Sequence, residues 1–511
     1  MFQKISHSTG VTDEEEILFS TPFNYLFPEA ARSAACLLPV SLNTIQGLKA
    51  LGNAMADNGS IGDPAGQGDS QIDALFTYIG QFIDHDITAR TDRDTTISDL
   101  SNESAITPAN PDNVIKTLKN GRRPQLDLDS VFGEGPGLAG STAQAKTQSQ
   151  ILYNNDLKLN LFKNGSRIDL PRQQINNPDP VQQAIIADGR NDENLNISQI
   201  QALFLSFYNH VYDVLSGTKE EKYIRARQLV RWSYQYAVVH DYLMAVCDRN
   251  IVLDVLANGP RFYSSTAGKG ETFMPLEFSV AAFRFGHSMI RPFYKLNNTN
   301  SAVHLVNMAG GLQILGPNAR ADNFDDDGQF VSGLMINWSN FIGNSAQKAR
   351  KLDTKIAHDL FTLPFRPSGD PILSSLTTSN LVRGYSLSIP TGQAVCDAMG
   401  IIPLSPSEIT STEDPAIAAV VTANNFDTRS PLWYYLLREA AVQQGGERLG
   451  EAGSRIVAET LIGLLKQDPN SYMNNLHDPA ITDTHIEVTG GAYGKISNFR
   501  SLLKFGGAAG L

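Results

Sequence analysis

The chain has 511 residues, and its 53 acidic and 41 basic side chains give a formal net charge of −12. This charge disfavours nucleic acid and anionic membranes as partners, because both would repel the protein. No stretch approaches the roughly 18 apolar residues that a membrane span requires, and three dispersed cysteines (Cys36, Cys247 and Cys396) form neither a disulfide framework nor a cysteine-rich metal site.

The first residues of the chain, MFQKISHSTGVTDEEEILF, contain no apolar segment after a basic stretch. A secretory signal needs such a segment. We therefore expect a cytoplasmic protein, with export by a signal-less route left open.

Two early segments are predicted to be irregular. Residues 52–70 are rich in Gly, Asp and Ser, and residues 91–125 are polar and contain Pro108, Pro111 and Pro124. We expect the second of these segments to form a long loop.

The chain beyond these segments carries mainly helical patterns, in which apolar residues recur at spacings of three and four. The pattern covers residues 197–215, 222–246, 276–290, 340–361, 431–441 and 452–466. Asn194 or Asn196 would serve as the N-cap of the first of these helices. Strand signals are few and short, as at 304–306 and 312–315.

The organisation of the chain favours one unit, although length alone would suggest about three domains. The sequence has no internal repeat of fixed period and no Gly/Ser or Pro linker long enough to separate domains. The predicted fold class is therefore mainly α, a single large helical domain with few short strands and long loops.

The segment GQFIDHD, residues 80–86, places polar side chains within an apolar-periodic stretch. At about 100° per residue, Gln81, Asp84 and His85 fall in one arc of a helix, while Asp86 points elsewhere. The arc therefore presents an amide, a carboxylate and an imidazole together. A helix end with solvated polar residues is the simpler alternative, and a side-chain metal site would lack a second nearby histidine.

A second histidine lies in AAFRFGHSMIRPF, residues 281–293, among apolar side chains. Alone, His287 would more often be a core histidine than a ligand. Arg284 lies one turn earlier and Arg291 one turn later, and cationic ends around an apolar centre suit an amphiphilic cofactor with carboxylates.

Two further segments are weaker signals when taken alone. DGRNDEN, residues 188–194, has the composition of a hydrophilic capping segment before a helix. In NGRRPQLDLDSVFG, residues 120–133, Asp127 and Asp129 alternate like ligands of a hard cation. Alternating acids are also common in loops that bind nothing.

Together these four segments resemble the animal-type haem peroxidases of the peroxidase–cyclooxygenase superfamily, and in particular their bacterial branch. Gln-x-x-Asp-His-Asp, Arg-x-x-Glu and Arg-x-Gly-His occur here in the order of that family. Further segments are similar to family segments: residues 204–213, 229–242, 348–364, 379–393 and the helices after 431. The resemblance implies a haem peroxidase domain at 71–470, an N-terminal extension at 1–70 packed on or near it, and a C-terminal extension at 471–511.

The resemblance implies roles on the peroxide side of the haem. His85 would be the distal base that moves a proton between the two peroxide oxygens. Arg190 would stabilise the charge that develops on the leaving oxygen, and Gln81 would hold the distal water. Asp84 and Glu193 match the two carboxylates that form ester bonds to haem methyl groups. Asn194 stands where some relatives have a haem-linked Met, so no sulfonium link is expected.

On the opposite side, the resemblance implies that His287 is the ligand of the haem iron. Its other ring nitrogen would donate to the Asn380 side chain, which makes the imidazole less anionic than a carboxylate partner would. Arg284 and Arg383 would pair with the haem propionates.

The resemblance also implies a calcium site that joins two of the segments. Asp86 would bind calcium together with Arg123, Gln125, Asp127 and Asp129 of one loop. Arg123 replaces the threonine of the family loop, so only its backbone carbonyl could serve as a ligand.

Hydrogen peroxide and a small reducing substrate are the expected reactants. Two other functions are the alternatives to a peroxidase. A fatty-acid dioxygenase of the superfamily would need a tyrosine three residues before the iron ligand, where this chain has Arg284. A non-catalytic haem-binding adhesion protein would not need Gln81, His85, Arg190 and Glu193 together. The sequence leaves open whether halides, thiocyanate, aromatic donors or a dedicated biosynthetic compound are oxidised, and in which oligomeric state.

Overall fold

The computed structural model describes residues 20–60, 68–92, 106–138, 151–165, 167–176, 180–264, 272–305, 332–361, 372, 375–411, 413–489 and 494–511. The structure is 52% helix and 11% strand, which confirms the predicted mainly α class. In the described ranges, no helix is both long enough and apolar enough to cross a bilayer.

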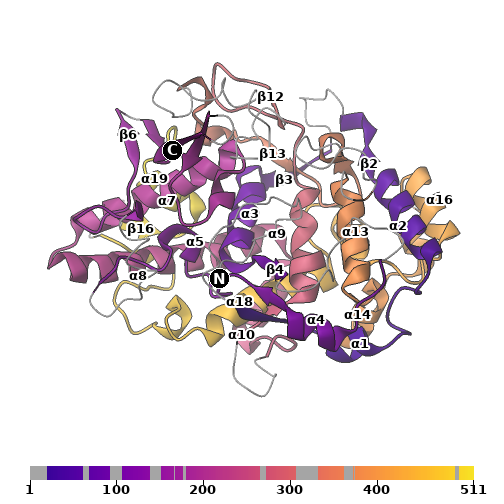
Figure 1. The fold of residues 1–511 in the computed structure, drawn as a ribbon. Helices are drawn as coiled ribbons and strands as arrows, with labels where there is room; N and C mark the ends of the chain where they lie inside the picture. The colour runs from indigo at the N-terminus through magenta and orange to yellow at the C-terminus, as the bar shows by residue number, and fades with distance from the viewer. Residues whose placement is uncertain are drawn as a thin grey trace.

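The α-helices carry most of the structure. They are α1 (Pro28–Arg32), α2 (Leu42–Ala54), α3 (Leu75–Ile87), α4 (Pro111–Thr117), α5 (Asp129–Phe132), α7 (Leu195–Val214), α8 (Lys219–Ala237), α9 (Leu243–Val246), α10 (Arg249–Asn258), α13 (Leu376–Ser386), α14 (Gly392–Met399), α15 (Pro406–Thr410), α16 (Pro415–Ala423), α17 (Leu432–Gln444), α18 (Glu451–Gln467) and α19 (Phe499–Phe505). Figure 1 shows α3 near the centre, with α7 and α8 on its left and α2, α13 and α14 on its right.

Short 3-10 and π-helical turns connect these helices. The 3-10 turns are η1 (Asn58–Ser60), η3 (Gly189–Asp192), η6 (Ala282–His287), η7 (Ser332–Leu334), η8 (Trp338–Asn340), η9 (His358–Phe361) and η10 (Tyr472–Asn474), and the π-helices are η4 (Val238–Tyr242) and η5 (Glu277–Ala281). Two of them, η3 and η6, carry residues of the candidate site, with α3 and α13 carrying others.

The strands are short and are divided among small sheets. They are β1 (Thr21–Asn24), β2 (Ala56–Asp57), β3 (Asp69–Asp73), β4 (Arg90–Asp92), β5 (Leu118–Asn120), β6 (Phe162–Asn164), β7 (Arg167–Asp169), β8 (Arg172–Asn176), β9 (Pro180–Ala184), β10 (Met274–Pro275), β11 (Phe293–Tyr294), β12 (Val303–His304), β13 (Lys348–Arg350), β14 (Ile356–Ala357), β15 (Ile486–Glu487) and β16 (Lys495–Ile496). Among the described residues, one sheet has four strands in the order β10-β1-β5-β4, and the other strands form pairs.

An aromatic cluster sets the rotation of α3 in the core. Phe82 of α3 stacks on Phe204 of α7 with ring centroids 4.6 Å apart, and Tyr234 of α8 meets both rings edge-on. Nearly every side chain of α7 from Leu195 to Tyr212 is buried, so this helix is enclosed on all sides rather than amphipathic. The cluster thereby determines which face of α3 meets η3.

The N-terminal segment is tied to the start of the η5–η6 region. Strand β1 pairs in parallel with β10, and the buried carboxylate of Glu277 accepts hydrogen bonds from the backbone N–H groups of Leu26 (2.7 Å) and Phe27 (3.0 Å). Burial raises the pKa of Glu277 to about 7. These contacts join residues 21–27 to the element that leads into η6.

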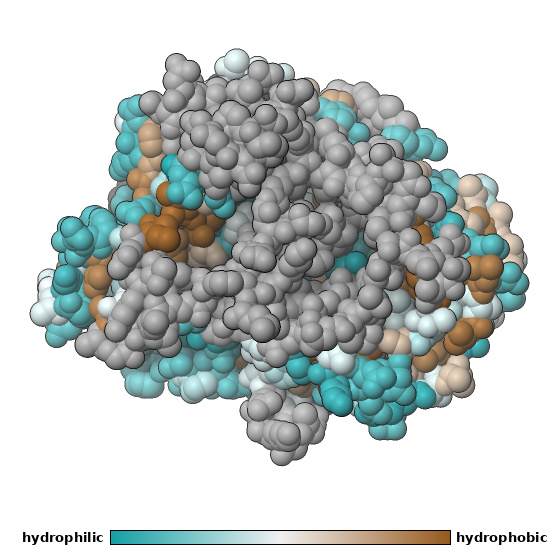
Figure 2. Space-filling view, viewed as in Figure 1, coloured by the Kyte–Doolittle hydropathy of each residue, from teal (hydrophilic) through white to brown (hydrophobic). Residues whose placement is uncertain are grey.

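The surface on the face seen in Figure 1 is mixed. Figure 2 shows hydrophilic side chains along the lower edge of the described residues, and hydrophobic patches near the right edge, where α2 and α16 lie. Scattered apolar residues of this kind are ordinary on a folded protein.

Most helix predictions are confirmed. Residues 197–215, 431–441 and 452–466 fold as α7, α17 and α18, and 222–246 fold as α8, η4 and α9. Asn194 is the N-cap of α7, because its Oδ1 accepts a hydrogen bond from the N–H of Ile197 at 3.0 Å. Residues 276–290 are helical through 287, but as π and 3-10 turns rather than α-helix.

Two predictions from local pattern were wrong. Residues 340–361 are not a helix, because Gly343 has φ +112°, outside the helical region, and Lys348–Arg350 pairs instead with β3. Within 91–125, Asn110 caps α4 with Pro111 in its first turn, so part of the expected loop is a helix, while residues 93–105 lie outside the described residues.

The short-strand predictions have mixed outcomes. Strand β12 covers Val303–His304, overlapping the first of them by one residue, whereas residues 312–315 lie outside the described residues. Residues 52–70 were predicted to be irregular, but the described part contains the end of α2, β2, η1 and the start of β3, while residues 61–67 lie outside the described residues.

Candidate active site

The candidate site begins with His85, which lies on α3 and is fully buried. Its Nδ1 lies 2.8 Å from Oδ1 of Asn191 in η3, and its Nε2 lies 3.5 Å from Oε1 of Glu193. The turn η3 therefore packs its polar side chains directly on the α3 face that carries His85. GQFIDHD and DGRNDEN, two separate motifs in the sequence, form one site.

Gln81 completes this face one turn before His85. Its Nε2 donates to Oε1 of Glu193, and its Oε1 accepts from Nδ2 of Asn194 at 3.1 Å. Asn194 is also the N-cap of α7. Both polar atoms of the Gln81 amide are thus hydrogen-bonded, and its NH₂ group faces the Glu193 carboxylate.

Arg190 is held against the C-terminal end of α3. Its Nη2 donates to the backbone oxygen of His85 and its Nη1 to that of Thr88, both at 2.8 Å, and Nε and Nη2 also bind the Asp188 carboxylate. Although burial alone would raise the pKa of Asp188, the guanidinium groups of Arg122 and Arg190 hold it far below its usual range. Asp188 thus stays ionised and keeps Arg190 in place.

On the other side, η6 presents His287 through a turn that packs against α3. His287 Nδ1 lies 2.8 Å from Nδ2 of Asn380 on α13. The indole ring of Trp433 meets the imidazole edge-on with centroids 6.3 Å apart, and its Nε1 donates to the backbone oxygen of Arg284 at 3.1 Å. Helices α13 and α17 together hold this turn.

The direction of the contact between His287 and Asn380 differs from the prediction. Arg284 Nη1 donates to Oδ1 of Asn380 at 2.9 Å, so the amide turns its NH₂ group toward His287. In this structure the amide nitrogen of Asn380, not its oxygen, thus faces His287 Nδ1, and the predicted donation from Nδ1 requires the amide to turn over. The sequence indicated the pair of residues but not the competing guanidinium.

Several features around His287 fit a porphyrin. Gly286 and Gly384 border open space, because a Cβ added at either residue would meet no heavy atom within 4 Å. Arg383 is buried on α13, and Arg284 lies in the turn that carries His287. An imidazole, two guanidinium groups and uncrowded backbone suit an iron porphyrin with two propionates. Arg291, by contrast, forms an ion pair with Asp69.

The three acids of the expected calcium site come together. Carboxylate oxygens of Asp86, Asp127 and Asp129 lie within 4.8 Å of one another, and all three residues are buried. Burial, and then the charge of Asp127, raises the pKa of Asp86 to about 7, and burial raises that of Asp129 well above its usual value. In the described part of the chain, Oδ1 of Asp127 and Oδ1 of Asp129 accept no hydrogen bond. Three buried carboxylates with spare oxygens suit a hard cation.

The backbone conformation of residues 126–128 directs Asp127 and Asp129 toward Asp86. Leu126 and Leu128 adopt left-handed conformations, with φ of 52° and 59°, which leucine rarely does. The N–H of Leu128 and the hydroxyl of Ser130 donate to Asp86 at 3.2 and 3.0 Å.

Of the two loop residues predicted as calcium ligands, Arg123 also meets the acids through its side chain. Arg123 approaches through its side chain, with Nη2 2.9 Å from Oδ2 of Asp127, and its carbonyl accepts from the N–H of Gln125 at 2.8 Å. A guanidinium therefore neutralises part of the acidic charge, which the sequence pattern did not reveal. Arg122 adds a second cation, 3.7 Å from Asp129 Oδ1.

Removing a divalent cation should lower the thermal stability of the protein. A cation present at 100 times its dissociation constant contributes about 2.7 kcal/mol, so EGTA should reduce the melting temperature by several degrees. Added calcium should restore it, and Asp129→Asn should abolish the difference. Identical melting curves of the parental protein with and without EGTA would argue against a bound cation.

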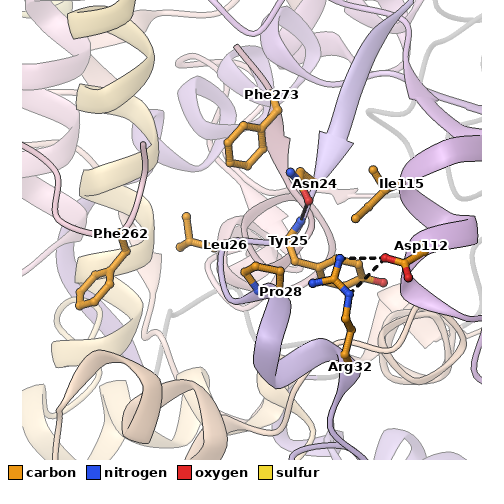
Figure 3. Close-up of a pocket in the computed structure, with 9 residues that line it drawn as sticks. All are labelled: Asn24, Tyr25, Leu26, Pro28, Arg32, Asp112, Ile115, Phe262 and Phe273. Carbon is orange, nitrogen blue, oxygen red and sulfur yellow. Dashed lines mark hydrogen bonds and ion pairs between the residues drawn. The ribbon is translucent and has the colours of Figure 1, made fainter. Parts of the chain in front are cut away.

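A separate cavity of about 350 Å³ lies beside the N-terminal segment. Figure 3 shows its lining residues: Asn24, Tyr25, Leu26, Pro28, Arg32, Asp112, Ile115, Phe262 and Phe273. Arg32 binds Asp112 through Nε and Nη2, and the Tyr25 hydroxyl donates to the backbone oxygen of Leu387. The two charged groups that line the cavity, Arg32 and Asp112, thus neutralise each other.

Sequence reasoning missed the residues that hold the site together. Asp188 and Asn191 flank the arginine of a motif already singled out, and Gln201 is a buried amide on α7, in a stretch that also contains the buried polar residues Asn196, Ser198 and Gln199. Gln201 gave no signal of its own, because several polar residues share this part of the helix. The two η3 residues gave no local signal, because their partners are distant in the chain.

Comparison with known proteins agrees with this geometry. A family model described as animal haem peroxidase matches residues 51–459. The chain belongs to the animal haem peroxidase family. The matched range contains every site residue described above.

Individual relatives of this family are distant. The thyroid peroxidases of Mus musculus and Rattus norvegicus are each 24% identical over 217 residues, 39% of this chain and 22% of theirs, so the chain spans about a fifth of their length. Peroxidase A from Dictyostelium discoideum has a TM-score of 0.60 at 17% identity, covering 94% of this chain and 96% of its own. The Oryza sativa fatty acid alpha-dioxygenase has a TM-score of 0.53 at 14% identity, covering 96% and 78%. At these identities the structures show a shared fold.

Proposed function

We propose that this chain is a haem peroxidase that reduces hydrogen peroxide and oxidises small substrates, such as halides, thiocyanate or aromatic donors. The observation that carries the proposal is the arrangement around α3. One face of this helix presents buried His85 beside Gln81 and Glu193, and η6 with His287 packs against the same helix. A base and an iron ligand on adjoining elements are what peroxide cleavage at a haem requires.

Haem b would supply the redox-active iron, with His287 holding it and Arg284 and Arg383 pairing with its propionates. On the peroxide side, His85 accepts a proton from one oxygen and returns it to the other, which leaves as water. Arg190 places a fixed positive charge beside His85, and among the described residues its Nη1 donates to Thr88 alone. Gln81 would hold the water or peroxide near His85.

We also propose that Asp84 and Glu193 form ester bonds to haem methyl groups. Asp84 is half-buried on the helix that carries His85, and Glu193 already lies between Gln81 and His85, so both carboxylates border the same site. The acidic cluster of Asp86, Asp127 and Asp129, which includes the residue that follows His85 on α3, would hold calcium.

The ester proposal predicts haem that resists extraction. After brief peroxide treatment, acid–butanone should remove little haem, and denaturing mass spectrometry should show protein plus porphyrin. Asp84→Ala and Glu193→Ala should each leave one link, and the double variant should release free haem. Complete release from the treated parental protein would exclude both esters while leaving the peroxidase proposal intact.

A fatty-acid dioxygenase is the second candidate, because structures of that class share the fold. Arg284, three residues before His287, binds Asn380 and takes the place of the tyrosine that such an enzyme would need. The deciding experiment measures the Soret spectrum of the purified protein, its reaction with peroxide, and oxygen uptake with a polyunsaturated fatty acid. We expect a peroxide-dependent spectral change and no regiospecific hydroperoxide; oxygen uptake giving one stereoisomer would reverse the assignment.

Three further assignments are proposals on the motifs and composition. They are membership of the bacterial branch, a cytoplasmic location, and the division of the chain into residues 1–70, 71–470 and 471–511. The contacts of β1 with β10 and of Glu277 with residues 26–27 support an N-terminal extension that packs on the domain.

A further inference from the structure

We propose that Asn191, anchored by Gln201, is a positioning residue that fixes which nitrogen of His85 carries the proton. The proposal rests on the proposed peroxidase function, in which His85 must accept a proton at the nitrogen that faces the substrate. Asn191, Gln201 and His85 are all fully buried, so water does not compete for their hydrogen bonds.

The chain of hydrogen bonds runs in one direction. Nδ2 of Asn191 donates to Oε1 of Gln201 at 2.9 Å, so the amide turns its carbonyl oxygen toward His85. That oxygen lies 2.8 Å from Nδ1 of His85. A carbonyl oxygen can only accept, and a neutral imidazole carries one proton, so the proton resides on Nδ1 and Nε2 keeps its lone pair.

The lone pair of Nε2 faces the site. Nε2 lies 3.5 Å from Oε1 of Glu193, and that oxygen already accepts a hydrogen bond from Gln81. The contact with Asn191 is the shorter one and therefore decides the tautomer. His85 can then take a proton from one peroxide oxygen at Nε2 and return it to the other, while the Nδ1 proton stays on Asn191.

The turn around Asn191 is anchored without it. On one side Asp188 binds both the N–H and the guanidinium of Arg190, and on the other Arg172 binds Asp192 through Nη1 and Nη2 at 2.6 and 2.8 Å. Substituting Asn191 should therefore leave η3 in place. The effect of the substitution then reports on His85 rather than on folding.

The test compares two ligands of the ferric holoprotein that differ in proton transfer. Hydrogen cyanide must lose a proton to a base as it binds, whereas nitric oxide binds without proton transfer. In stopped-flow measurements, Asn191→Leu should slow cyanide association and peroxide reaction at least about 10-fold, the order of the loss when a metal-bound histidine loses its outer-shell partner. Nitric oxide association should change less than about 2-fold. Asn191→Asp keeps an acceptor oxygen and should restore most of the cyanide rate.

Two glutamines on α7 provide a matched pair of controls. Gln201→Leu removes the anchor of Asn191 and should slow cyanide association. Gln199→Leu should not, because Gln199, equally buried, binds the backbone of Leu334 and Ile336 instead. A parental cyanide rate in Asn191→Leu, or equal slowing of cyanide and nitric oxide, would overturn the inference. His85→Gln distinguishes failure of the proposed function from failure of this inference. If both His85→Gln and Asn191→Leu bind cyanide at the parental rate, the proposed function fails. If His85→Gln is slow and Asn191→Leu is not, only the role of Asn191 fails.

Discussion

Replacing His85 with alanine should slow the reaction of the ferric protein with hydrogen peroxide by at least about 100-fold, the lower range for general acid–base catalysis. His85 is the buried imidazole on the α3 face shared with Gln81, and its Nε2 faces Glu193 across 3.5 Å. Without it, no side chain at that position accepts and returns the peroxide proton. Stopped-flow absorbance of the haem after mixing with peroxide measures the rate, and haem content should remain close to parental.

A control histidine separates this effect from general damage. His240 lies on η4, where its Nε2 is 3.0 Å from the Tyr472 hydroxyl, and it belongs to no motif of the site. His240→Ala should react with peroxide at the parental rate. A His85→Ala variant that reacts as fast as the parental protein would remove His85 from the mechanism.

The second large effect is expected at His287. His287→Ala should lose most of its haem, because the iron would have no other protein ligand on that side. The variant should still fold: Trp433 and Asn380 belong to α17 and α13, helices that remain packed without the imidazole. The pyridine haemochrome assay measures haem content, and circular dichroism monitors the helices. Full haem occupancy with an unchanged spectrum would exclude His287 as the ligand.

Asn380 offers a finer test of the same assignment. Asn380→Asp replaces the amide nitrogen beside His287 Nδ1 with a carboxylate oxygen, which can only accept; donation from Nδ1 to it makes the imidazole more anionic and should lower the Fe(III)/Fe(II) potential. Arg284, which binds Oδ1 of Asn380, would offset part of this charge. Spectroelectrochemical titration measures the potential, and an unchanged or raised value would argue that Asn380 does not act on the iron through His287.

Some features of this protein follow from the sequence alone. The helices α7, α8, α17 and α18 were predictable, because the spacing of apolar residues that marks a helix is a local property of the chain. The helical arc of GQFIDHD was predictable for the same reason: it directs Asp86 away from His85, and the structure places the two residues in different clusters.

Only the tertiary structure decided how the side chains pair. Residues 340–361 have helical spacing, yet Gly343 and the pairing of β13 with β3 determine their conformation. The hydrogen bond from Arg284 to Asn380, the approach of Arg123 to Asp127 and the contact of Asn191 with His85 depend on short distances between side chains. Whether an amide side chain donates to a partner or accepts from it depends on which group binds the other polar atom of the amide. That group can lie anywhere in the chain, so a sequence specifies which polar groups are available, and packing specifies which of them meet.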